Sequence, residues 1–264
     1  MKLLDFWNGE PALYEKGTEL PELKYFPADK KSGDGAVIIF PGGGYTHRAI
    51  HEGDGYAEFL NSIGLDAFVL EYRVSPNRFP IPLLDARRAV RYVRKNAEAF
   101  GISPDKIAVM GSSAGGHLAA LTSTLKSEVD GDCGDGFEGV SFLPNAQILA
   151  YPVITPAGHI GSYAYLLGEE FDLYKNTVNP SVLAEKDTPP AFIWHTSKDP
   201  VVSVANTYEY ASVLSRLGVP VELHVYPYGN HGLGLANSGS FKCEHVTSWA
   251  NLLTRWLKLM SFIK

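Results

Sequence analysis

One serine in the sequence stands in a setting that suits a nucleophile. Ser113 is the middle residue of the run Gly111-Ser112-Ser113-Ala114-Gly115, which directly follows an apolar segment and directly precedes a stretch of small and apolar residues. A tight turn between strand and helix, with glycine on both sides, exposes a serine hydroxyl at the carboxyl edge of a sheet. The amino-terminal end of the helix also favours negative charge that develops there. The pattern predicts a nucleophile elbow, because a phosphate-binding loop would need the GxGxxG spacing or the P-loop lysine, and this run has neither.

A serine nucleophile needs a general base and an acid that orients the base, and both follow downstream. Asp199 comes just after the predicted strand 191–195, and His231 comes after the predicted strand 221–226. The order serine, acid, histidine is one of the known orders of such triads. Carboxyl ends of parallel strands share the edge at which open α/β sheets bind ligands. We therefore predict that Ser113 is the nucleophile, His231 the base and Asp199 the orienting acid.

The other acids and histidines are weaker candidates for these roles. Asp187 and Glu185 are the remaining acids to consider. His117 lies one helical turn beyond Ser113, and the helix carries it away from the elbow. His195 and His224 fall in predicted strands, and His47 and His51 are placed at the mouth of the pocket. His159 lies in a later insertion, and His245 begins the last helix.

An oxyanion hole requires backbone N–H groups that point at the developing negative charge. Ala114 follows the nucleophile, and the run Pro41-Gly42-Gly43-Gly44-Tyr45 follows another predicted strand. Glycine lets the backbone approach a substrate oxygen closely, so we expect the N–H groups of Gly43, Gly44 and Ala114 to bind the oxyanion. Substrate contacts are predicted from side chains near these segments and in the later insertion: Tyr45, His47, Ser112, Tyr163 and Tyr165.

These residues can meet only if strands and helices alternate, and the hydrophobic pattern favours this. Continuous apolar runs are typical of strands that are buried on both faces, as in parallel sheets. Such runs occur at 36–40, 67–70, 106–110, 146–151, 191–195 and 221–226, and an edge strand is expected near 24–26. Helical spacing is found at 55–63, 83–100, 114–125, 203–217 and 246–263. The alternation predicts an α/β fold with a mostly parallel central sheet flanked by helices.

A length of 264 residues is within the range that one α/β domain uses, and we expect residues 1–264 to form a single domain. Residues 155–190 break the alternation, because they contain no clean strand but several aromatic residues and prolines. We interpret this stretch as a small cap that is inserted in the domain and covers the predicted pocket.

Composition excludes several classes of protein. A net charge of −6 with 45% hydrophobic and 20% charged residues indicates a globular chain without the basic field of a nucleic-acid-binding protein. The sequence contains no run of about 18 apolar residues, so no membrane helix is predicted. The first residues lack the apolar core of a secretory signal. Cys133 and Cys243 form no CxxC pair, which suits a reducing cytosol, although a single bridge between them stays open. We expect a cytoplasmic protein.

No metal and no organic cofactor are expected. The acidic, glycine-rich stretch 130–136 departs from the EF-hand pattern, which Gly134 and Ser141 break at two ligand positions, so we interpret it as a solvated loop. The expected partner is a small-molecule ester substrate, with neither nucleic acid nor membrane. The sequence leaves open whether the chain forms a homodimer.

Taken together, these segments resemble the α/β-hydrolase superfamily, and within it the acetyl-esterase/lipase group, which includes hormone-sensitive-lipase-like esterases and acetylxylan- or feruloyl-esterase-like proteins. The resemblance covers roughly residues 36–235 and is carried by residues 40–45, 72–73, 111–119, 188–190, 198–202, 217–220 and 229–232. Lipase-like relatives often have histidine where this chain has Pro41, so the chain is nearer to the sugar-ester branch. Because proline offers no side-chain hydrogen bond, other residues must brace the glycine loop.

Residues and resemblance together imply a serine carboxylesterase that acts on short acyl esters, with acetyl as the expected acyl group and a sugar as a candidate alcohol. An amidase, formamidase or small peptidase on the same fold is the first alternative, because a serine triad serves esters and amides alike. A binding protein that keeps the fold without catalysis is the second alternative. The presence of all three triad residues argues against it.

Overall fold

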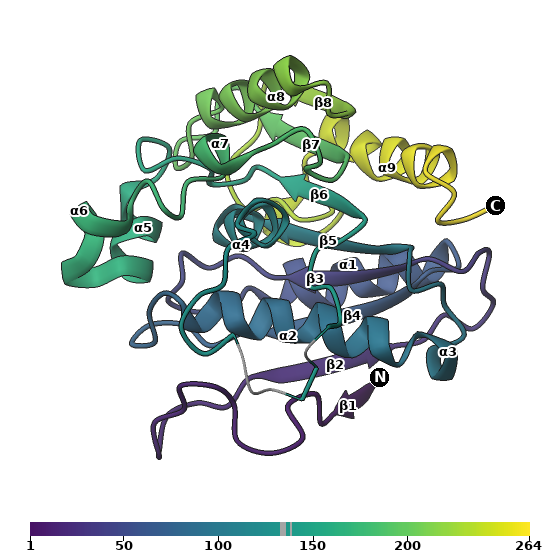
Figure 1. Cartoon of the computed structure of the whole chain (residues 1–264). Coiled ribbons are helices and arrows are strands. Elements are labelled where there is room, and N and C mark those ends of the chain that lie inside the picture. The colour runs from purple at the N-terminus through teal and green to yellow at the C-terminus, as the bar shows by residue number, and fades with distance from the viewer. Residues whose placement is uncertain (133–135, 138) are drawn as a thin grey trace.

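In the computed structural model, which describes residues 1–132, 136, 137 and 139–264, eight strands form one sheet (Figure 1). The strands are β1 (Lys2–Leu4), β2 (Glu22–Phe26), β3 (Ala36–Phe40), β4 (Asp66–Glu71), β5 (Ile107–Ser112), β6 (Ala146–Ala150), β7 (Ala191–Thr196) and β8 (Val221–Tyr226). Their order across the sheet is β1-β2-β4-β3-β5-β6-β7-β8. Strand β2 pairs with β1 and with β4 in the antiparallel sense, and β3 to β8 are mutually parallel. The predicted fold class, a mostly parallel sheet flanked by helices, is confirmed.

The central strands are buried on both faces, as their continuous apolar runs predict. Successive side chains of a strand point to opposite faces. In β3, Ile38 and Phe40 join one hydrophobic core, whereas Val37 and Ile39 join a second core on the other face. All five residues of β3 are inaccessible to solvent. The sheet therefore lies between two apolar layers and provides a rigid platform for the loops at its ends.

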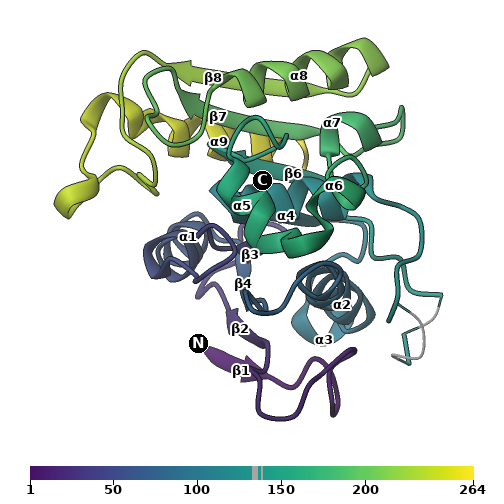
Figure 2. The ribbon, with the colours of Figure 1, turned by 90° about the vertical axis from the view of Figure 1, so that its left-hand side faces the viewer.

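Helices supply these two layers (Figure 2). One face of the sheet is covered by α1 (Ile50–Ser62) and α9 (Ser248–Leu259), and the other by α2 (Ile81–Lys95), α3 (Ala97–Phe100), α4 (Ser113–Thr124) and α8 (Ala205–Leu217). No helix among the described residues is both long and apolar enough to cross a membrane.

Two predicted helices differ from those observed. The helix expected at 83–100 is divided into α2 and α3 at Asn96, whose side-chain amide donates to the carbonyl of Tyr92 (2.8 Å) and competes with the helical pattern. The helix expected from residue 55 begins at Ile50 instead. This earlier start adds Glu52 to the first turn of α1, at the edge of the sheet where the glycine loop lies.

Between β6 and β7 the chain forms short helices and no strand, as the sequence predicts for residues 155–190. These helices are α5 (Ile160–Leu167), η1 (Gly168–Glu170), α6 (Phe171–Tyr174) and α7 (Pro180–Leu183), and α5 and α6 face the viewer in Figure 2. Two further short helices, η2 (Gly239–Phe241) and η3 (Glu244–Val246), precede α9. Cys243 is a free thiol, and Cys133 lies outside the described residues, as does part of the predicted 130–136 loop.

Candidate active site

The turn that carries Ser113 is tight. Strand β5 ends at Ser112 and α4 begins at the next residue, where Ser113 has φ +53°, a conformation that costs free energy for a residue with a Cβ. A Cβ on Gly111 would lie 2.1 Å from the carbonyl oxygen of Gly115, and a Cβ on Gly115 would lie 2.0 Å from that of Phe40. Glycine is therefore required on both sides of Ser113, and the fold holds the serine hydroxyl at the carboxyl end of β5.

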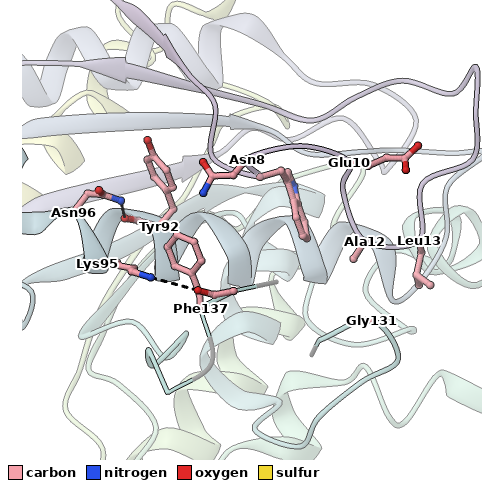
Figure 3. A pocket seen from close by; sticks show the side chains of 11 residues that line it. Asn8, Glu10, Ala12, Leu13, Tyr92, Lys95, Asn96, Gly131 and Phe137 are labelled. Atoms are coloured by element: carbon pink, nitrogen blue, oxygen red, sulfur yellow. Dashed lines mark hydrogen bonds between the residues drawn. The ribbon is translucent and has the colours of Figure 1, made fainter. Parts of the chain in front are cut away.

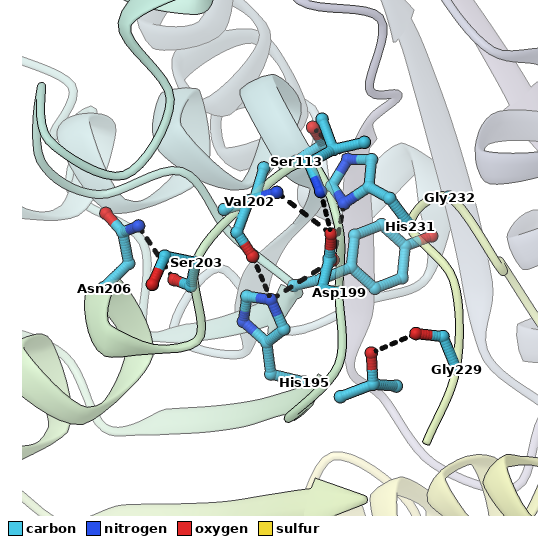
Figure 4. A network of polar contacts seen from close by, with 12 residues as sticks. Ser113, His195, Asp199, Val202, Ser203, Asn206, Gly229, His231 and Gly232 are labelled. Atoms are coloured by element: carbon cyan, nitrogen blue, oxygen red, sulfur yellow. Dashed lines mark hydrogen bonds and ion pairs between the residues drawn. The ribbon is translucent and has the colours of Figure 1, made fainter. Parts of the chain in front are cut away.

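Three side chains from three separate loops meet at this point (Figure 4). The Oγ of Ser113 lies 2.8 Å from Nε2 of His231, and Nδ1 of His231 lies 2.7 Å from Oδ2 of Asp199. Because the carboxylate can only accept, Nδ1 carries the proton and Nε2 presents its lone pair to the serine hydroxyl. In this arrangement the imidazole is able to take the hydroxyl proton.

Four donors hold the carboxylate of Asp199. Oδ1 accepts from the backbone N–H groups of Val201 (2.8 Å) and Val202 (2.9 Å), while Oδ2 accepts from His231 and lies 3.3 Å from Nε2 of His195. Burial raises the pKa of Asp199, but the hydrogen bonds from His195 and His231 outweigh burial and hold that pKa well below its ordinary value. Asp199 therefore stays ionised over the whole range in which an imidazole works as a base.

A cavity of about 400 Å³ opens above the nucleophile. Gly43 and Gly44, the predicted oxyanion donors, line it together with Ser113, and the N–H of Ala114 follows in the first turn of α4. The predicted substrate contacts that line it are His47 and Tyr165. Further lining residues come from α1, the 155–190 segment and the neighbouring loops: Thr46, Ala49, His51, Glu52, His159, Val201, His231, Gly232 and Phe241.

Three of the predicted substrate contacts do not reach this cavity, which corrects the expectation for Tyr45, Ser112 and Tyr163. All three are buried. Tyr45 has φ +63° and its hydroxyl donates to Nδ1 of His117 (2.7 Å), while Tyr163 donates to two backbone carbonyls. The side chain of Ser112 points to the face opposite α4 and contacts the hydroxyl of Tyr56 (2.9 Å). These three side chains therefore form hydrogen bonds inside the protein and do not face the cavity.

His117 is a buried structural histidine, as its position in α4 suggests. Its Nε2 donates to the carbonyl of Val178 (2.7 Å), and its Nδ1 accepts from Tyr45. The bond from Tyr45 requires the neutral ring, because a protonated Nδ1 cannot accept. Burial lowers the pKa of His117 from 6.5 to about 4, against the opposing effect of the Val178 bond. The unfolded chain, in which the pKa is ordinary, therefore binds this proton first as the pH falls.

This pKa difference predicts an acid-induced loss of stability. Neutral His117 contributes fully to stability above about pH 6.5, and this contribution is lost as the pH falls towards 4. At pH 4.5 the loss lowers the free energy of unfolding by about 2–3 kcal/mol. Urea denaturation at pH 7.5 and pH 4.5 measures this loss. In His117→Gln, the difference in the free energy of unfolding between pH 7.5 and pH 4.5 should be smaller by that amount. An equal difference in the variant and the native protein would contradict the assignment.

Sequence reasoning did not identify three residues that the structure brings to the site. His195, expected in the core, is indeed buried but also lies against Asp199, and its Nδ1 accepts from Thr207 Oγ1 (2.7 Å). Its position four residues before the acid was an available signal. Phe241 stacks on His51 at 4.0 Å between ring centroids and lines the cavity. No local pattern distinguishes Phe241 or the buried Glu52 from ordinary residues.

A larger cavity of about 830 Å³ lies away from the triad, between the amino-terminal segment and α2 (Figure 3). Trp7, Tyr92 and Lys95 are among its lining residues, and none of the described residues that line it is a serine, cysteine or histidine. The described residues also contain no group of three or more side chains that could hold a metal ion. Ser113 and His231, which line the smaller cavity, therefore mark it as the candidate active site.

Comparisons with known proteins identify similar families and similar structures. The BD-FAE family model matches residues 24–154, and the model of the prolyl oligopeptidase family matches residues 153–257. Among solved structures, the chain is similar to an acetyl ester-xyloside bifunctional hydrolase from Caldicellulosiruptor lactoaceticus, with 41% identity and a TM-score of 0.92, over 100% of this chain and 97% of that one.

Two curated relatives are longer than this chain. The chain is 38% identical over 213 residues to endo-1,4-beta-xylanase B of Butyrivibrio fibrisolvens, covering 78% of this chain and 33% of the relative. It is 31% identical over 237 residues to an acetylxylan esterase of Xylanibacter ruminicola, covering 84% of this chain and 45% of the relative. The chain thus spans between a third and a half of the length of these relatives.

Proposed function

Because the chain belongs to the α/β-hydrolase acetyl esterase/lipase-like family, we propose that it is a serine carboxylesterase that hydrolyses esters of short acyl groups, acetyl above all. The observation that carries the proposal is the unbroken chain of hydrogen bonds from Ser113 through His231 to Asp199, at 2.8 and 2.7 Å, on a strand-to-helix elbow.

The first half of the reaction forms an acyl-enzyme. The hydroxyl proton of Ser113 passes to Nε2 of His231 while the serine oxygen attacks the ester carbonyl carbon. Asp199 holds the imidazole in the required tautomer and stabilises the imidazolium that forms. His231 then gives its proton to the leaving alkoxide, and the alcohol departs.

The second half releases the acid. Water gives a proton to His231 and its oxygen attacks the acyl carbon, after which the proton returns to Ser113 and the carboxylic acid leaves. In both halves the negative charge on the carbonyl oxygen is stabilised by the backbone N–H groups of Gly43, Gly44 and Ala114, which supply the oxyanion hole. Fixed donors of this kind need no reorganisation as the charge develops.

Cavity size and lining support a small substrate. A volume of about 400 Å³ is at the lower end of ordinary small-molecule sites. We propose that the 155–190 segment acts as a small cap, since it contributes His159 and Tyr165 to the lining. Aromatic faces such as Tyr165 suit a sugar ring, and the names of two of the similar proteins contain acetylxylan or xyloside, so a sugar is the proposed alcohol. The cytoplasmic location predicted from the cysteines belongs to the same proposal.

An acyl-length series tests this substrate assignment. We expect kcat/KM to be highest for p-nitrophenyl acetate and to fall by at least about tenfold towards the octanoate, because each methylene that does not fit costs binding in the transition state. Acetylated xylo-oligosaccharides should release acetate in the same assay. A higher kcat/KM for the octanoate than for the acetate would contradict a short-acyl site.

Amide hydrolysis is the second candidate, and the prolyl oligopeptidase match over 153–257, which contains Asp199 and His231, is the observation that favours it. The two functions are separated by substrate. Turnover of N-formyl amides or short peptides at a higher kcat/KM than acetyl esters would favour the amidase. Higher kcat/KM on acetylated sugars would favour the esterase.

A further inference from the structure

We propose that Glu52 is a positioning residue that holds the glycine loop and the loop of His231 in a fixed relation to each other. The inference rests on the proposed function, because it assigns a supporting role for the same reaction. Glu52 lies in the first turn of α1 and is 2% exposed. Its two carboxylate oxygens accept hydrogen bonds from groups that belong to different loops.

One oxygen braces the glycine loop. Oε2 of Glu52 accepts from the backbone N–H of Gly42 at 2.9 Å, directly before the predicted oxyanion donors. A Cβ on Gly42 would lie 2.3 Å from this oxygen, so the carboxylate packs against the backbone itself. The hydroxyl of Tyr72 donates to the carbonyl of Pro41 at 2.7 Å. Together these two bonds brace a loop in which Pro41 has no polar side chain.

The other oxygen braces the loop of the base. Oε1 of Glu52 accepts from the hydroxyl of Tyr151 at 2.6 Å, and this hydroxyl in turn accepts from the backbone N–H of Gly234 at 2.8 Å. The ring of Tyr151 also meets the imidazole of His231 edge to face, with 5.1 Å between the ring centroids. Burial and then the Glu52 carboxylate hold the pKa of Tyr151 well above its ordinary value, so the phenol remains a donor.

The two braced loops come from strands that are far apart in the sheet. The glycine loop follows β3, whereas the loop of His231 follows β8, and β5, β6 and β7 lie between them. The oxyanion donors and the base must nevertheless act on the same carbonyl group, where a displacement of about 1 Å can cost on the order of 10²-fold in rate. A single buried carboxylate, hydrogen-bonded directly to the glycine loop and through Tyr151 to the loop of His231, fixes this distance before substrate arrives.

Glu52→Gln tests the inference with almost no change in shape. The amide has one acceptor oxygen, so its NH₂ group must face the N–H of Gly42 or the hydroxyl of Tyr151. We expect kcat for p-nitrophenyl acetate to fall by about 10–100-fold with KM within about threefold, because positioning acts in the transition state. Affinity for phenylboronic acid, whose serine adduct is tetrahedral, should fall by the same factor as kcat/KM.

Two further variants separate positioning from general destabilisation. Tyr151→Phe removes the hydroxyl that joins Glu52 to Gly234, while the bond from Gly42 to Glu52 remains. This variant should lower kcat by about tenfold, with the same match to boronate affinity. Tyr56→Phe is the matched control, because its buried hydroxyl contacts Tyr151 and Ser112 but neither loop, and its kcat should stay within about twofold of the native value. Native kcat and native boronate affinity in both Glu52→Gln and Tyr151→Phe would overturn the inference, even if their melting temperatures fell.

Amide exchange gives a readout that does not depend on catalysis. In Glu52→Gln, the amides of Gly42 and Gly234 should exchange with deuterium at least about tenfold faster than in the native protein, while central β5 amides such as that of Val109 stay unchanged. Unchanged exchange at both glycines in the folded variant would overturn the inference. A native protein without esterase activity would end the proposed function instead, and the exchange experiment would still decide the role of Glu52.

Discussion

Replacing Ser113 by alanine is expected to lower kcat for p-nitrophenyl acetate by a factor on the order of 10⁶. The substitution removes the one protein atom that becomes bonded to the acyl group in the proposed mechanism. It leaves the fold intact, because alanine occupies the same backbone conformation at φ +53° with about the same cost as serine. Initial rates at saturating ester, with the folded fraction checked by circular dichroism, measure the effect.

The neighbouring serine provides the control. Ser112→Ala removes a buried hydroxyl that contacts Tyr56, not the cavity, and should keep kcat within a few-fold of the native value. A fluorophosphonate probe should label the native protein and Ser112→Ala but not Ser113→Ala. Near-native activity of Ser113→Ala would end the proposed mechanism, and absence of labelling in the native protein would favour a binding protein that has lost catalysis.

The second large effect is expected from Asp199→Asn, which should lower kcat by about 10³–10⁴-fold with little change in KM. The asparagine oxygen can still accept from the N–H groups of Val201 and Val202, which then directs its NH₂ group at His231. An NH₂ donor forces the other tautomer, in which Nε2 carries a proton and cannot take one from Ser113. Steady-state kinetics on the acetate ester give both constants.

Asp187→Asn is the matched control for this carboxylate. Asp187 was the alternative acid in the sequence, but it lies on the surface in an ion pair with Lys126. Exposed ion pairs contribute little to stability, so this variant should show native kcat and a nearly native melting temperature. If Asp187→Asn lost activity and Asp199→Asn kept it, the assignment of the acid would be wrong.

The fold was largely predictable because its signals are local and strong. The run 36–40 coincides with β3, since a strand that is buried in a parallel sheet must be apolar along its whole length. The run 221–226 coincides with β8, although this strand is partly exposed. The division of the helix at Asn96 was missed, because one side-chain hydrogen bond decides it and the hydrophobic spacing continues past it. Helix ends depend on such single contacts, whereas the existence of an element depends on many.

The candidate site was predictable where chain order and strand ends decide it. Ser113, Asp199 and His231 each follow a strand, and parallel strands bring such positions to one edge. Side-chain direction was not predictable in the same way. Tyr45 and Tyr163 are near the site in sequence or in space but point into the core, and Glu52 contacts it from a helix that the sequence placed five residues too late.

The position of β8 at the margin of the sheet has a consequence for heat tolerance. Among the strands that the structure describes, this one pairs with β7 alone, and every one of its residues is partly exposed, whereas β5 is fully buried between β3 and β6. Segments with fewer buried contacts open at a lower free energy than the core. His231 is therefore attached to a part of the protein that opens at a lower free energy than the part that carries Ser113. We expect the temperature at which activity is lost to be set by this margin, below the temperature at which the sheet as a whole unfolds.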